Sequence, residues 1–156
     1  MYLHLKLLYL AGFSLFCSAI LQLKGQAILE VADQSLSEDA TTVTVPITVT
    51  GFSGIGGMQF TLAWDPAVLT FNTLGDFDHS ALATELFYFT ETNFNVDNVS
   101  DGYFTVLYEQ ILAADATVAD GETIFSVTFD VVGASGASSQ VSFTDDPTLR
   151  LSLIHI

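Results

Sequence analysis

The sequence predicts an all-β fold, an antiparallel β-sandwich, on the strength of three observations. Apolar and polar side chains alternate along several short segments, which is the period of a half-buried strand. Gly, Asp and Pro residues separate these segments and supply the chemistry of turns. No long stretch repeats with a helical period, although Ser80–Phe87 could form one or two helical turns. Short strands joined by turns are typical of a sandwich or barrel around one hydrophobic core.

The first two strands are expected near the start of the domain. Ile28–Val31 is a short first strand, and Thr42–Thr50 alternates Val and Ile with Thr and Pro. Pro46 falls on the outward phase of the second segment. Because proline cannot donate a ladder hydrogen bond, this position predicts an edge strand or a bulge.

The next strand is expected after a glycine-rich turn at Gly51–Gly57. Met58–Trp64 alternates again, with Trp64 on the inward phase and therefore in the core. Asp65-Pro66 then ends the strand as a turn. The small residues of Gly133–Ser139 predict a flexible hairpin loop. Further strands are expected at Val68–Leu74, Tyr103–Tyr108, Thr123–Val132 and Gln140–Thr144.

Charge is distributed unevenly along the 156 residues, which contain three Lys plus Arg and 18 Asp plus Glu for a formal net charge of −15. The basic residues are Lys6, Lys24 and Arg150, so Ile28–Leu149 holds all 18 acids without a Lys or Arg and has a formal charge of −18. A segment without cations cannot neutralise phosphates. This excludes nucleic acid binding and attachment to an anionic membrane surface.

Both ends of the chain differ from the domain between them. Residues 1–27 contain an uncharged apolar run followed by small residues, which is typical of a secretory signal peptide, with an uncleaved membrane anchor as the alternative. Residues 151–156 match the in-frame translation of a transposon adaptor used in sequencing libraries. We therefore expect a secreted or cell-surface protein with a single domain at residues 28–150. Cys17 lies within the signal, so the domain has no thiol for a disulfide or a nucleophile.

Several ordered segments resemble the cohesin domain family. They are V-x-V-P-I-x-V at Val43–Val49, G-I-G-G-M-Q-F-x-L-x-W-D-P-x-V-L at Gly54–Leu69, D-G-x-x-x-F-x-V-x-F-x-V at Asp120–Val131, and V-x-F at Val141–Phe143. The resemblance implies a nine-stranded jelly-roll sandwich, secreted or displayed outside the cell. It also implies binding to dockerin domains, through which cohesins assemble polysaccharide-degrading enzymes on scaffolds.

The resemblance also implies a last strand, paired with the first, just after Arg150. That strand is missing from this sequence. We therefore expect the first strand to lack a partner and the domain to be incomplete at its C-terminus, with the tail at residues 151–156 able to imitate the missing strand.

Dockerin recognition in the family uses one face of a sheet, and the resemblance places candidate contacts at outward strand positions. Well-studied cohesins have Asn and Asp at the first two of these positions, whereas this chain has Gly57 and Gln59, which changes the usual hydrogen bonds. The alternative is an ordinary solvated face, although a flat face of small polar residues suits protein docking. The candidate partner-binding residues are Gly57, Gln59, Thr61, Ala63, Thr105, Glu109 and Gln110.

Two further kinds of site are suggested by single segments. Asn93, Asn95 and Asp97 begin with the alternate spacing of a calcium loop, but Phe104 stands where the twelfth-position carboxylate belongs, and Asx turns explain the run as well. This makes Ca²⁺ the one cofactor to consider. Tyr88 and Tyr103 could stack on sugar rings, with packing in the core or in loops as the alternative.

Catalysis is not expected from this composition. The domain has one histidine, His79, and neither Cys nor Lys, which leaves little material for a catalytic triad and no cation to tune a carboxylate. We therefore expect a secreted, non-catalytic binding module that docks a dockerin or another extracellular protein domain in a polysaccharide-degrading or surface assembly. Direct carbohydrate binding and a structural spacer role in a surface adhesin are the alternatives.

Overall fold

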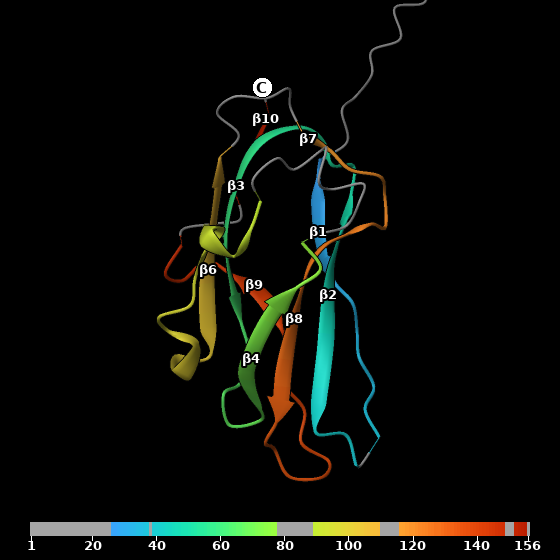
Figure 1. The fold of residues 1–156 in the computed structure, drawn as a ribbon, viewed down its shortest axis with the longest axis vertical. Helices are drawn as coiled ribbons and strands as arrows, with labels where there is room; N and C mark the ends of the chain where they lie inside the picture. The colour runs from blue at the N-terminus through green and yellow to red at the C-terminus, as the bar shows by residue number, and fades with distance from the viewer. Residues whose placement is uncertain (1–25, 38, 78–88, 110–115, 149–151, 156) are drawn as a thin grey trace, which may run out of the picture.

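The computed structural model describes residues 26–37, 39–77, 89–109, 116–148 and 152–155. They form two antiparallel sheets that pack face to face (Figure 1), which confirms the predicted all-β sandwich. Sheet A has the strand order β1-β2-β8-β4, with β1 at Ile28–Val31, β2 at Thr42–Thr50, β8 at Thr123–Val131 and β4 at Leu69–Gly75. Sheet B has the order β10-β3-β6-β5, with β7 and β9 also paired to β3. Its strands are β3 at Ser53–Ala63, β5 at Phe94–Asn95, β6 at Tyr103–Glu109, β7 at Ala116–Thr117, β9 at Ser142–Thr144 and β10 at Ser152–His155.

Two 3-10 turns, η1 at Glu91–Asn93 and η2 at Val99–Asp101, flank β5. The helical turn expected at Ser80–Phe87 lies outside the described residues. No helix in the described part of the chain is long and apolar enough to cross a membrane.

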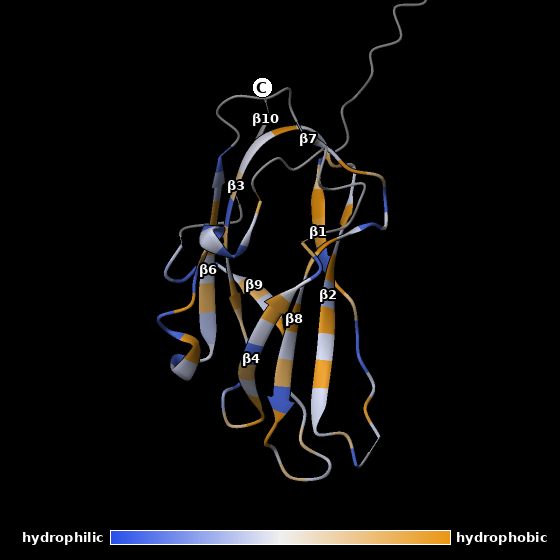
Figure 2. Cartoon of the chain, viewed as in Figure 1, coloured by the Kyte–Doolittle hydropathy of each residue, from blue (hydrophilic) through white to orange (hydrophobic). Residues whose placement is uncertain are grey.

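The core lies between the two sheets and is rich in aromatic rings. Along β2 hydrophobic residues alternate with residues of intermediate hydropathy (orange and near-white in Figure 2), and the hydrophobic ones are buried, so one side of the strand faces the core. Trp64 is only 6% exposed and packs against Phe129 and Phe104, with ring centroids 5.0 Å and 5.9 Å away, as expected from its inward phase. The largest fully buried side chains are Tyr108, Phe52, Phe60, Phe104, Phe125, Phe129, Ile47, Ile55, Met58, Leu62, Ile124 and Val49.

The glycine-rich turn expected at Gly51–Gly57 is much shorter than predicted. The turn is confined to the residues around Gly51, whose carbonyl accepts a hydrogen bond from the Ser53 N–H at 3.0 Å. From Ser53 onward the chain is already in β3, because β7 pairs with Ser53 and Ile55 and β10 pairs with positions further along. Pairing with neighbouring strands therefore keeps Gly56 and Gly57 within β3, whereas Gly54, with φ = 68°, lies at the register shift between Ser53 and Ile55.

Two loop and edge predictions also need correction. Pro46 lies in an interior strand, not at an edge, since β2 is between β1 and β8. It is tolerated because β1 pairs only with residues 47–50 and leaves this part of β2 without a neighbour on that side, and a register shift follows between Ile47 and Thr48. The predicted hairpin loop at Gly133–Ser139 instead connects β8 in sheet A with β9 in sheet B.

The end of the chain pairs differently from the expectation. The tail forms β10, but β10 lies antiparallel to β3 and not against β1. β9 pairs with Thr61–Ala63 and β10 with Ile55–Gln59, so both strands lie along β3. Among the described residues β1 is paired with β2 alone, as expected for the first strand.

Candidate functional site

The outer face of sheet B is a grid of outward side chains from four paired strands. Its central row contains Thr144 of β9, Thr61 of β3, Thr105 of β6 and Asn95 of β5, which are register partners from one strand to the next. The other rows are Ser142, Ala63 and Tyr103 on one side, and Gln59 with Leu107 followed by Gly57 with Glu109 on the other. These residues face outward because the alternate positions of β3 and β6 fill the core.

Six of the seven predicted partner-binding residues belong to this face, and Gln110 lies outside the described residues. Gln59 and Glu109 are exposed, and Ala63 and Thr105 are partly exposed. Gly57 and Thr61 are buried although they lie on the outward phase. The structure therefore brings the predicted residues together, but it leaves only part of the set accessible to a partner.

Thr61 is buried by the segment Asp145–Thr148, which we call the cover segment. The backbone N–H of Thr148 donates a hydrogen bond to the Thr61 hydroxyl oxygen at 3.3 Å, and the two residues are 8% and 0% exposed. The segment leaves the edge of β3 after Thr144, opposite Thr61, and the chain rejoins that edge at Ser152, opposite Gln59. Thr61 therefore offers no surface to a partner in this structure.

Leu107 is a prominent residue of this face that the sequence-based set omitted. It is 61% exposed, more than any other large apolar side chain in residues 26–148 whose burial the structure describes. It lies in β6 opposite Gln59, and its carbonyl accepts a hydrogen bond from Asn93 Nδ2 at 3.0 Å. The sequence did contain a signal, because Leu107 interrupts the polar phase of an alternating strand.

The residues proposed for calcium instead make contacts within the fold. Asn93 Oδ1 accepts a hydrogen bond from the Thr90 N–H at 2.9 Å, while Asn93 Nδ2 donates a hydrogen bond to the Leu107 carbonyl oxygen in β6. Asn95 Oδ1 accepts a bond from the Asp97 N–H at 3.0 Å, which is an Asx turn. Within the described ranges no group of three or more His, Cys, Asp or Glu could hold a metal ion. Calcium binding stays a prediction.

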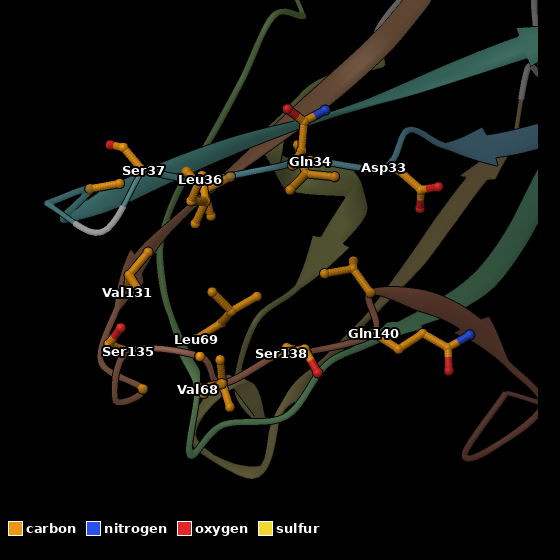
Figure 3. A pocket seen from close by; sticks show the side chains of 18 of the residues that line it. Asp33, Gln34, Leu36, Ser37, Val68, Leu69, Val131, Ser135, Ser138 and Gln140 are labelled. Atoms are coloured by element: carbon orange, nitrogen blue, oxygen red, sulfur yellow. The ribbon is translucent and has the colours of Figure 1, made fainter.

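The structure shows no stacking surface for sugar rings in the part of the chain that it describes. Tyr88 lies outside that part, Tyr103 is half-buried, and every other described aromatic side chain is buried or half-buried. A cavity of about 960 Å³ opens between the loops at 32–41 and 133–141, with Leu36 on one side and Val68 and Leu69 on the other (Figure 3). None of the described residues that line it is aromatic.

The fold and the outer face of sheet B together describe an all-β module with one broad, mostly polar sheet face. The sequence model of the Cohesin domain family matches residues 31–153, so the chain belongs to this family. The match includes part of the tail at residues 151–156, whose adaptor origin stays a prediction. No curated protein matches the chain in sequence.

Solved structures of cohesins share this fold at low sequence identity. A chain of the CaDoc0917–CaCohA2 complex aligns with a TM-score of 0.59 at 19% identity, over 83% of this chain and 87% of that one. The type I cohesin–dockerin complex of OlpA and Doc918 from Clostridium thermocellum gives 0.53 at 17% identity, over 76% and 83%. The third cohesin of ScaC from Acetivibrio cellulolyticus, in complex with the ScaB dockerin, gives 0.52 at 20% identity, over 73% and 76%.

Proposed function

We propose that this chain is a non-catalytic docking module that binds a dockerin, or another extracellular protein domain, through the outer face of sheet B. The observation that carries the proposal is the composition of that face. Its paired strands present small polar residues around the exposed Gln59 and Leu107. Such a surface suits contact with another protein better than enclosure of a small molecule.

Membership of the cohesin family supports a dockerin as the partner, since similar solved structures are complexes with dockerins. The absence of Lys and Arg from Ile28–Leu149 supports a role without catalysis, because no cation is available to tune a carboxylate. The apolar run in residues 1–27 supports export. The module would therefore work outside the cell, in a polysaccharide-degrading or surface assembly.

A binding assay with matched variants tests this proposal. The immobilised protein is offered a panel of dockerins and a panel of insoluble glycans. We expect at least one dockerin to bind, and we expect Gln59→Arg to abolish that binding because it places a bulky charged side chain on the face. Thr70→Arg adds the same side chain to an exposed position of β4 in sheet A and should leave binding unchanged.

Three results would contradict the proposal. Retention on glycans without binding of any dockerin would favour direct carbohydrate recognition. An equal loss of dockerin binding in both arginine variants would show that the contact is not specific to the outer face of sheet B. Failure to bind either panel would favour a structural spacer.

A further inference from the structure

The outer face of sheet B has a neutral centre in an otherwise acidic protein. Of the outward positions of β3 and β6, only Glu109 carries a charge. At the centre, Leu107 lies opposite Gln59 of β3. Along β6 its next neighbour on the same side of the sheet is Thr105. Its backbone is held in place, since the neighbouring Val106 and Tyr108 side chains are buried in the core. Leu107 is thus an exposed apolar side chain on a rigid support.

Carboxylates surround this neutral centre. Glu109 stands at one end of β6. Asp145 and Asp146 belong to the exposed part of the cover segment, on the β9 side of the face. Asp97 follows β5 on the opposite side and is also exposed. We call Glu109, Asp97, Asp145 and Asp146 the acidic rim.

The rim is not neutralised by cations of the described residues, because they include no Lys or Arg. The negative potential around the face therefore attracts a cationic partner and repels an anionic one. A second copy of this chain is a poor occupant, since each copy carries a formal −18 between Ile28 and Leu149. A neutral glycan gains nothing from the rim.

On the basis of the proposed docking function, we propose that the face selects a basic dockerin surface. An apolar side chain of the partner packs against Leu107 at the centre, and Lys or Arg side chains around it meet the acidic rim. The two parts act differently. Burial of a central apolar anchor slows dissociation, whereas complementary charge around it mainly speeds association and makes the rate depend on salt.

Kinetics with the bound dockerin from the panel separate the two parts. Association and dissociation rates are measured between about 50 mM and about 500 mM NaCl, where the Debye length falls severalfold. The anchor variant is Leu107→Ala, and its control is Val132→Ala, at another exposed apolar residue just after β8. The rim variant combines Glu109→Gln, Asp145→Asn and Asp146→Asn. Its control removes the same charge from the β1 side of sheet A with Glu30→Gln, Asp33→Asn and Asp39→Asn, and thermal melting verifies that every variant is folded.

We expect wild-type association to slow about tenfold or more across the salt range. The rim variant should associate several times more slowly at low salt, and its association rate should depend less on salt. Its control should change the association rate and the salt dependence much less. Leu107→Ala should dissociate about tenfold faster with the wild-type salt dependence. Val132→Ala should behave as wild type.

A dockerin that binds without salt dependence, or that tolerates Leu107→Ala, would overturn this inference and leave the docking function intact. Equal changes in association rate for the rim variant and its control would also overturn it, because the net charge of the protein, and not the position of the rim, would then explain the change. Salt-promoted self-association at this face would favour a second copy as occupant. Failure of every dockerin to bind would contradict the docking function itself, and this inference with it.

Discussion

The backbone N–H of Thr148 donates a hydrogen bond to the hydroxyl of Thr61, joining residues that are 87 positions apart. The bond attaches the cover segment to the middle of β3 and takes Thr61 out of the surface. It also makes Thr61 a structural residue at the position where the family resemblance expected a partner contact. The stability of the cover segment therefore depends on an outward residue of the sheet.

Replacing Thr61 with Val should destabilise the domain by about 1–2 kcal/mol, because the buried Thr148 N–H loses its acceptor while the shape of the side chain is kept. Chemical denaturation measures the change. Thr105→Val is the matched control, since Thr105 lies opposite Thr61 in β6 and is partly exposed to water. If both variants lose the same stability, the hydrogen bond does not hold the cover segment.

Phe125→Ala should cost about 3–5 kcal/mol of unfolding free energy, as expected for a fully buried aromatic side chain. The ring of Phe125 lies within 5.0 Å of Phe94 and 6.1 Å of both Phe60 and Phe89, centroid to centroid. Its removal leaves a cavity between the two sheets. Phe143→Ala provides the comparison, because Phe143 is only partly buried, and a cost as large as that of Phe125→Ala would contradict this account of the core.

Gly102→Ala should destabilise the domain by several times as much as Gly136→Ala. Both glycines have φ = 84°, so both substitutions force a residue with a Cβ into the left-handed region. At Gly102 the added Cβ would also lie 2.5 Å from the Trp64 carbonyl oxygen, whereas at Gly136 it meets nothing within 4 Å. Thermal melting of the pair isolates the steric contribution, and equal melting temperatures would argue against it.

Stability should fall in alkaline solution through Tyr108. Burial raises the pKa of the Tyr108 phenol above its ordinary value of 10.0, so the unfolded chain ionises before the folded one. The contribution is complete below about pH 10 and is lost as the pH rises toward the folded-state pKa, by up to about 1.4 kcal/mol per pH unit. Denaturation of wild type and Tyr108→Phe from pH 8 to pH 11 measures it as a difference that grows above about pH 10. A constant difference would contradict the assignment to this phenol.

Strands with a strong alternation of apolar and polar residues could be located from the sequence. The alternation in Thr42–Thr50 and Thr123–Val131 is strong enough to place β2 and β8 within one residue. The positions taken from the family resemblance lie together on the outward phase of one sheet, while their role in binding stays a prediction. The glycines before Met58 were misread because their inclusion in a strand depends on pairing with β7 and β10. Sequence near Thr61 gives no hint of its burial either, because the segment that covers it arrives from the other end of the domain.

Leu107 shows a different limit. Its place on the outward phase of β6 was readable from the alternation, but its importance depends on its neighbours being polar and on its exposure, which only the sheet register reveals. The acidic rim is similar. Composition showed that the domain is acidic, whereas the position of Asp145 and Asp146 beside a neutral centre follows from the path of the cover segment.

The absence of Lys and Arg between Ile28 and Leu149 also bears on how this domain resists proteolysis. Trypsin-like enzymes cut after basic residues, and this stretch offers them no cleavable bond, whether it is folded or unfolded. Its survival against such enzymes therefore does not depend on folding stability, as it does for a domain that is cut whenever it opens. A module without basic residues can tolerate a marginal, easily opened edge where another protein would be digested.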